Sequence, residues 1–261
     1  MNVLIATPLY DRPEPEMVSC VEATRDALRA RGDYVPPWMW LRGGLVQESR
    51  NAICARFLQE PFDVLVQIDH DHTWRSVDVM SAVDFVSEAG PGEVCGFAHP
   101  MKQTDFRGPL GVLTSPRLLP DRPIQYVDFK GQAVYAKVGA VGGGILVTSR
   151  LAIETVAKNA RILPNGLRAV FDIAAGTGED VQFCATWRKL GGTVYCDLHA
   201  QIGHIGRHVY RGSLGDELRK LEAREAARSE AAVSGLTTAG LEDVPNQNMQ
   251  SLLDQLKRIK E

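Results

Sequence analysis

The sequence lacks long hydrophobic runs, clustered cysteines and a strong excess of either charge. The apolar residues at its amino terminus stop at Pro8, which is too early for a signal peptide or a membrane span. Its five cysteines show no CxxC spacing, and each lies in an apolar periodic segment. They are therefore predicted to be reduced thiols in a core. We expect a soluble, cytoplasmic protein without a transmembrane segment.

The charge balance and length restrict the function only loosely. A net charge of −3 gives no electrostatic footprint for non-specific nucleic-acid binding, although it leaves a local basic patch open. The composition, 44% hydrophobic and 23% charged, is that of an ordinary globular protein. A chain of 261 residues is long enough for one large α/β domain or two small ones.

Short apolar runs alternate with helix-periodic segments over the first hundred residues. This alternation predicts an α/β fold with a mostly parallel central sheet flanked by helices on both faces. The predicted strands or extended segments are residues 3–6, 34–41, 64–68, 93–98, 124–128, 133–138 and 193–198. We expect one domain over residues 1–212, then a helical extension with a linker over 213–261. A final helix at 249–259 is short enough to suggest packing on the body or on a second copy.

The run at residues 64–68 is followed at once by Asp69, His70, Asp71 and His72. Open α/β sheets bind their ligands at the carboxyl ends of strands, where these side chains are expected to lie. Two carboxylates separated by one residue can share a divalent cation and, through it, the phosphates of a nucleotide. The alternative is a charged turn that only caps the next helix.

Two later segments add chemistry of the same kind. Glu179 and Asp180 open a helix after Gly178, and His204 lies between two glycines after a strand. Carboxylate ligands suit Mg²⁺ or Mn²⁺, and an imidazole favours Mn²⁺. A carboxylate could also accept the proton of an acceptor hydroxyl. The simpler alternatives are a helix stabilised by acidic residues in its first turn and an ordinary loop histidine.

The order of these motifs resembles that of the metal-dependent nucleotide-sugar glycosyltransferases of GT-A fold, especially the inverting family 2. The resemblance covers approximately residues 1–206. The matching segments are Leu4-Ile5-Ala6-Thr7-Pro8, Arg50-Asn51 followed by Phe57-Leu58, the DxD-like Asp69-His70-Asp71, the glycine-rich residues 142–150 that end in an arginine, the "GEDxxF" residues 178–184, and His204-Ile205-Gly206.

This resemblance implies roles for individual residues. Asp71 would ligate Mn²⁺ or Mg²⁺ directly, Asp69 would contact the metal-bound water or the ribose, and His204 would be a further metal ligand. His70 and His72 are not expected to be ligands. Asp180, with Glu179 beside it, would deprotonate the acceptor hydroxyl for displacement with inversion. A UDP- or GDP-linked sugar would be held by Thr7, Pro8, Tyr10, Arg12, Arg50 and Asp69, and the acceptor by Trp74, Gly143 and Gly144.

Several alternatives stay open. A nucleotidyltransferase would be expected to have a GxGTR-type loop where Thr7-Pro8-Leu9-Tyr10 stand, and a metal-dependent hydrolase would need a histidine at the position of Ile68. A catalytically silent nucleotide-binding scaffold is a third possibility. Retaining relatives also carry a "GED" pattern, so the stereochemistry is undecided. The acceptor could be a glycan, a lipid, a protein or a modified nucleic-acid base, and residues 101–123 are a candidate lid.

Overall fold

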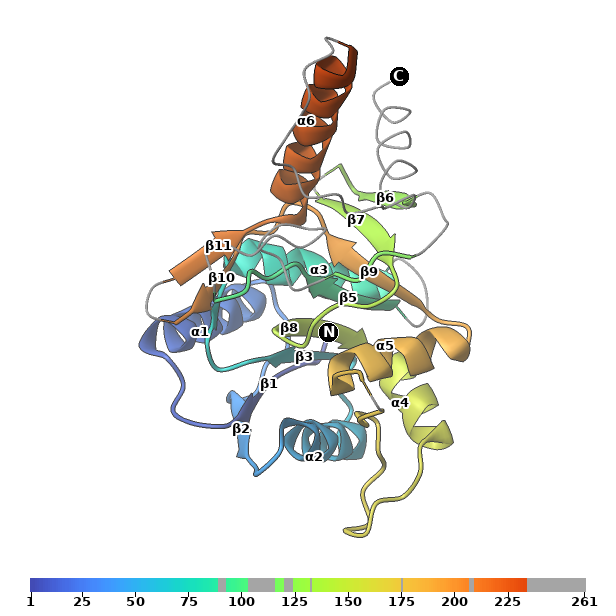
Figure 1. The fold of residues 1–261 in the computed structure, drawn as a ribbon. Coiled ribbons are helices and arrows are strands. Elements are labelled where there is room, and N and C mark those ends of the chain that lie inside the picture. Colours follow the sequence, from blue (N-terminus) through green and yellow to red (C-terminus); the bar gives the residue numbers. More distant parts are fainter. Residues whose placement is uncertain are drawn as a thin grey trace.

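The structure is a computed structural model that describes residues 1–88, 93–102, 116–119, 124–131, 133–174, 176–206 and 209–233. An eight-stranded sheet forms its centre, in the order β2-β1-β3-β8-β5-β9-β7-β6 (Figure 1). These strands are β1 Val3–Leu9, β2 Met39–Arg42, β3 Val64–Ile68, β5 Glu93–Phe97, β6 Tyr126–Phe129, β7 Ala133–Val138, β8 Ile145–Ser149 and β9 Thr193–Asp197. A three-stranded sheet contains β11 Val209–Gly212, β10 Ile202–Ile205 and β4 His72–Thr73.

The central sheet is mixed. β1 pairs in parallel with both β2 and β3, and β5 pairs in parallel with β9. β8 is inserted antiparallel between β3 and β5, and β7 is antiparallel to both β9 and β6. The predicted α/β class, with a central sheet flanked by helices, is confirmed, but the sheet is mixed rather than mostly parallel, because β8 and β7 are inserted antiparallel to their neighbours.

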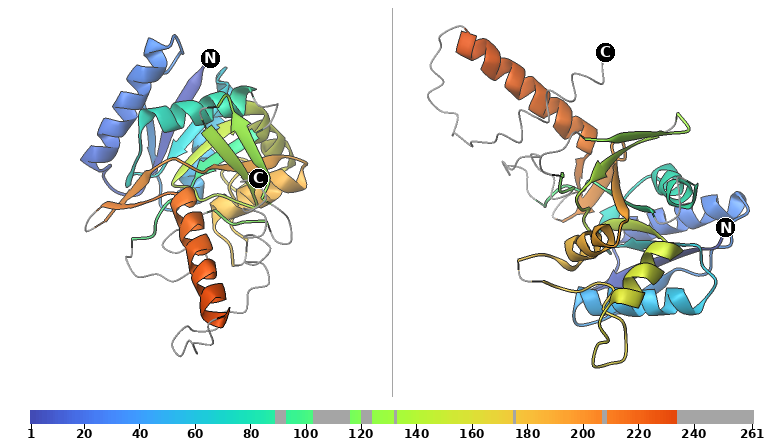
Figure 2. Two further views of the ribbon diagram at one scale, coloured as in Figure 1. Left: turned by 90° about the horizontal axis from the view of Figure 1, so that it is seen from above. Right: turned by 90° about the vertical axis from the view of Figure 1, so that its right-hand side faces the viewer.

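Helices cover both faces of the central sheet (Figures 1 and 2). The helices α1 Pro15–Ala30 and α3 Ser76–Glu88 pack on one face, through buried residues that include Met17, Val21 and Val83. The helices α2 Val46–Gln59, α4 Arg150–Asn159 and α5 Glu179–Lys189 pack on the other. Burial of these apolar stripes is the main stabilising term of such a layered fold.

Local sequence signals set most helix ends. The Ser149 side chain accepts a hydrogen bond from the Ala152 amide at 3.3 Å and so caps the amino terminus of α4, a position at which serine is favoured. Gly32 and Gly191, which follow the ends of α1 and α5, have φ angles of 98° and 95° that favour glycine. Val46 begins α2 and is 40% exposed, whereas Ile53 and Phe57 of the same helix are buried.

A long helix, α6 Leu214–Val233, stands out from the body (Figure 2). Its first turns are anchored, since Leu214 and Leu218 are buried in the core. The predicted linker, the terminal helix at 249–259 and most of the loop at 101–123 lie outside the described residues. The domain boundary at residue 212 therefore stays a prediction.

Two further expectations from the sequence concern composition. All five cysteines are free thiols, and four of them are buried as predicted, whereas Cys20 is only half-buried on α1. Among the described residues, none of the helices combines the length and the apolar character that a bilayer span requires.

Candidate functional site

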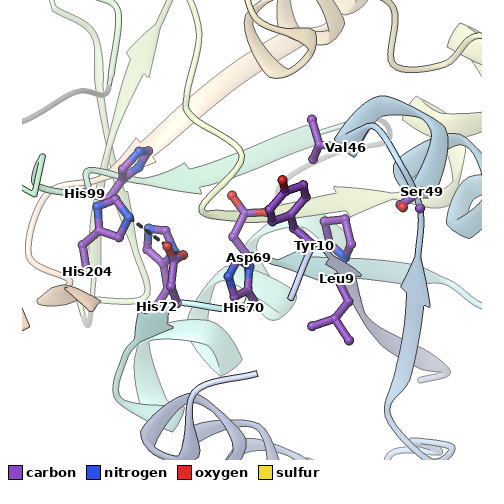
Figure 3. Close-up of a pocket in the computed structure, with 12 residues that line it drawn as sticks. Leu9, Tyr10, Val46, Ser49, Asp69, His70, His72, His99 and His204 are labelled. Atoms are coloured by element: carbon purple, nitrogen blue, oxygen red, sulfur yellow. Dashed lines mark ion pairs between the residues drawn. The ribbon is translucent and has the colours of Figure 1, made fainter. Parts of the chain in front are cut away.

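A pocket lies at the carboxyl ends of β1 and β3, which are parallel neighbours in the sheet. Because parallel neighbours end at the same edge, the loop after β1 faces the side chains after β3. The pocket is lined by Pro8, Leu9, Tyr10, Gly43, Val46, Ser49, Asp69, His70, Asp71, His72, His99 and His204. Four of the six histidines of the chain are in this lining. Figure 3 shows His72, His99 and His204 gathered at one side and Tyr10 with Val46 at the other.

Asp71, His72 and His204 form a group that could hold a metal ion, with one ligand atom from each lying within 4.8 Å of the others. Strand pairing brings the two histidines together, since His72 of β4 lies opposite His204 of β10. Their rings stack with centroids 4.4 Å apart. The Asp71 carboxylate lies 3.0 Å from His72 Nδ1 and 3.4 Å from His204 Nε2.

The hydrogen bond of His204 tests whether this group suits a cation. Its Nδ1 lies 2.7 Å from the Pro100 carbonyl oxygen, which can only accept, so Nδ1 carries the proton. Nε2, 3.4 Å from Asp71 Oδ2, donates to that carboxylate when the ring is protonated and presents a lone pair to it when the ring is neutral, as it must be to bind a metal. Two facing acceptors are stabilised by a cation between them, and an outer hydrogen bond of this kind is typical of metal-ligating histidines.

The donor set narrows the choice of metal. His72 is 2% exposed, and its Nε2 has no hydrogen-bond partner among the described residues. Two imidazoles and one carboxylate fit Mn²⁺ or Zn²⁺ better than Mg²⁺, which prefers oxygen ligands. Burial alone would raise the pKa of Asp71, but contacts with His204, His72 and Lys102 lower it below its usual range. Asp71 is therefore ionised, as a metal ligand must be.

Asp69 belongs to a different network. Its carboxylate accepts a hydrogen bond from Arg50 Nη2 at 2.6 Å, and it is not part of the Asp71 group. The Arg50 side chain is fully buried and also donates to Gln67 at 3.2 Å and to the Gly143 carbonyl at 3.0 Å. Its Nε donates to Glu179 at 3.3 Å. Every guanidinium nitrogen thus has a protein acceptor, so the structure does not place Arg50 to bind a diphosphate.

Three successive glycines, at positions 142 to 144, lie directly against side chains of the site. A Cβ on Gly142 would overlap His99, one on Gly143 would overlap Arg50, and one on Gly144 would lie 2.6 Å from His72 Nε2. The predicted acceptor residues Gly143 and Gly144 therefore have a structural reason to be glycine. Their acceptor role stays a prediction.

Asp180 lies at the start of α5 and faces a second, adjoining pocket. This pocket is lined by His99, Arg117, Ala140, Val141, Gly142, Gly178, Asp180 and Val181, so His99 borders both pockets. The Asp180 carboxylate accepts hydrogen bonds from the amides of Gly143 at 2.8 Å and Val181 at 2.6 Å. The Glu179 carboxylate is paired with Arg50 instead. The pKa of Glu179 is raised, because the effect of burial is larger than the lowering effect of the Arg50 charge.

The remaining predicted site residues divide into two groups. Pro8 and Tyr10 line the first pocket, and Tyr10 is 76% exposed. Thr7 is buried and accepts a hydrogen bond from Trp38 Nε1 at 3.0 Å, while Arg12 is exposed outside the lining. Trp74 is not brought to either pocket. It lies in the core, where its Nε1 donates to Thr24 at 2.9 Å.

Sequence reasoning missed His72, His99 and Lys102. His72 was set aside as a ligand, yet it belongs to the metal-competent group. Alternation along an extended chain would have grouped His72 with His70, which is outside that group, so the local pattern did not indicate His72 as a ligand. Lys102 Nζ lies 2.6 Å from Asp71 Oδ2, and nothing in the local sequence indicated that contact.

Comparisons with known proteins identify no family. No protein-family profile matches the sequence, and no curated protein matches it. Among solved structures, the crystal structure of A197 from STIV is similar over 78% of this chain and 85% of that chain, with 15% identity and a TM-score of 0.44. CMP:2-keto-3-deoxy-manno-octonic acid synthetase complexed with CTP is similar over 75% and 89%, with 11% identity and a TM-score of 0.39. Similarities this low assign no function.

Proposed function

We propose that this protein is a metal-dependent glycosyltransferase that moves a sugar from a UDP- or GDP-linked donor to an acceptor hydroxyl. One arrangement carries the proposal. The group Asp71, His72 and His204 shares a pocket with the loop after β1, and Asp180 faces the adjoining pocket across His99. A cation-binding group beside a carboxylate is what displacement of a nucleoside diphosphate requires.

The first pocket suits the donor. Pro8, Leu9, Tyr10 and Val46 offer apolar surface to a base, and the metal-competent group lies in the same lining. A divalent ion held by Asp71, His72 and His204 would supply positive charge against the diphosphate. Asp69, held in place by Arg50 and 29% exposed at its side chain, is assigned to the ribose rather than to the metal.

Asp180 is assigned as the general base. The acceptor oxygen forms a bond to the anomeric carbon, the bond from that carbon to the diphosphate breaks, and the diphosphate leaves with the electron pair. The acceptor proton passes to the Asp180 carboxylate, which two backbone amides hold in orientation. Glu179 is less suited to this role, because its carboxylate is already paired with Arg50.

Nucleotide binding tests the donor part of the proposal. Thermal unfolding should shift upward with UDP or GDP in the presence of Mn²⁺ and much less without it, because ligands that bind only the native state stabilise it. Asp71→Asn should lose the metal-dependent shift. His70→Gln, which alters the same pocket outside the metal-competent group, is the matched control and should keep it. A wild-type protein that no nucleoside diphosphate stabilises, with Mn²⁺ or Zn²⁺ present, would contradict the proposal.

A reaction assay separates the enzymatic alternatives. Incubation with a panel of UDP- and GDP-sugars should release the nucleoside diphosphate, and Asp180→Asn should reduce sugar transfer while nucleotide binding persists. Release of pyrophosphate from a nucleoside triphosphate and a sugar phosphate would indicate nucleotidyl transfer instead. Metal-dependent binding without turnover of any donor or triphosphate would indicate a binding protein.

A further inference from the structure

Lys102 makes an ion pair inside the metal-competent group. Its Nζ lies 2.6 Å from Asp71 Oδ2, the same oxygen that lies 3.4 Å from His204 Nε2. Two residues earlier, the Pro100 carbonyl accepts the hydrogen bond that orients His204. The segment after β5 therefore contacts the group twice, once through the Pro100 carbonyl oxygen and once through the Lys102 ammonium.

The ammonium and a divalent ion cannot keep the same oxygen. A divalent ion binds a carboxylate oxygen at about 2 Å, so an ammonium left in place would lie within about 5 Å of it. Like charges at that separation repel strongly in a partly buried site. Lys102 can leave easily, because its side chain is 42% exposed and lysine has a long, flexible stem.

We propose that Lys102 is a displaceable counter-cation, which neutralises Asp71 until a divalent ion binds and then contacts the phosphates of the donor. This inference rests on the proposed function. The ammonium is a point charge with three donors, which suits a phosphate, and its attachment beside the pocket keeps it within reach of one. Lys102 is a positioning and binding residue, and it takes no part in proton transfer.

The proposal requires two effects of opposite sign. Removing the ammonium should make Mn²⁺ bind more tightly when no nucleotide is present, because a competitor for Asp71 is lost. The same change should weaken nucleoside diphosphate binding once the metal site is saturated. A lysine that only supported the fold would weaken both.

The test compares Lys102→Met with the wild type by isothermal titration. For Mn²⁺ alone, the variant should have a Kd about threefold to fivefold lower, as expected for loss of one partly exposed ion pair. For UDP or GDP at saturating Mn²⁺, its Kd should be about tenfold higher, as expected for loss of one charge-assisted contact. Uridine and guanosine, which lack phosphates, should bind both proteins equally.

Two further variants serve as controls. Lys102→Arg keeps the charge and should restore both constants toward the wild type. Lys130→Met removes a surface lysine paired with Glu88 and should change neither. Unfolding without ligands should show that all variants are folded.

Each outcome decides between the two proposals. Tighter Mn²⁺ binding with weaker diphosphate binding supports the role of Lys102. If the wild type binds Mn²⁺ and Lys102→Met binds it equally or more weakly, the counter-cation role is wrong and the proposed function stands. If the wild type binds neither Mn²⁺ nor Zn²⁺, both fail.

Discussion

Arg50 donates to Asp69 at 2.6 Å from a side chain that is fully buried. The same guanidinium reaches Glu179, which lies 129 positions along the chain from it. One buried cation therefore joins the carboxylate that follows β3 to the carboxylate that opens α5. Through the Gly143 peptide, whose carbonyl accepts from Arg50 and whose amide donates to Asp180, the connection extends to the proposed base.

Removal of Arg50 should destabilise the protein strongly. In Arg50→Met, Asp69 and Glu179 lose their shared counter-charge, and breaking a buried ion pair typically costs about 3–5 kcal/mol. Urea unfolding measures the loss. Arg161→Met is the control, because it removes an Arg–Asp pair with the exposed partner Asp172 and should change the unfolding free energy little. Equal effects of the two changes would show that the buried network is not a stabilising unit.

Gly143→Ala should disturb Arg50. The added Cβ would overlap the guanidinium, which cannot yield without losing its acceptors, and overpacking of this kind costs about 1–3 kcal/mol. The proposed base should also be displaced, so transfer activity should fall. Gly44→Ala provides the comparison, since the nearest atom to its Cβ is the end of the Glu48 side chain at 4.0 Å. If Gly143→Ala had the unfolding free energy of the wild type, the backbone around residue 143 would have to shift enough to accept the added Cβ without moving Arg50.

Loss of His72 should weaken metal binding. His72→Gln removes a buried imidazole from the metal-competent group, and Mn²⁺ affinity should fall at least about tenfold. His70→Gln, one position before Asp71 and outside the group, should leave that affinity nearly unchanged. Titration with Mn²⁺ and with Zn²⁺ measures both. If His70→Gln weakened Mn²⁺ binding and His72→Gln did not, the prediction from the sequence that His72 is not a ligand would be right.

Trp74→Phe should affect stability rather than recognition. The ring remains apolar, but the hydrogen bond from Nε1 to Thr24 is lost, which costs about 1 kcal/mol. The KM for the acceptor should not change, because the side chain lies in the core and outside both pockets. A raised KM with unchanged stability would support the acceptor role predicted from the sequence.

The pH dependence of the unfolding free energy should reflect the protonation of Glu179. Its pKa is raised in the folded protein above the ordinary value of 4.5, chiefly by burial, so the folded state binds the proton more tightly than the unfolded state. The unfolding free energy should therefore fall as pH rises from 4.5 through the folded pKa. Glu179→Gln should lose this part of the dependence. Urea midpoints between pH 4.5 and 7 test it, and parallel curves for the two proteins would contradict it.

Local sequence was enough to predict most of the elements. Residues 64–68 form β3 as predicted, because a short, β-branched apolar run is typical of a strand that is buried on both faces of a sheet. Ser149 and Gly191 mark helix ends through their own backbone and side-chain chemistry. The α/β class and the position of Asp71 in a pocket follow from the same reasoning, since ligands bind where parallel strands end at one edge.

Contacts between distant residues decided the rest. The antiparallel position of β8 between β3 and β5 depends on pairing between segments at least 50 positions apart, which no local pattern encodes. The stacking of His72 on His204 follows from the register of β4 with β10. The burial of Arg50 and the approach of Lys102 to Asp71 depend on charges that the fold brings together. The sequence alone determined which groups are available for chemistry, and the tertiary structure decided which of them are already paired with each other.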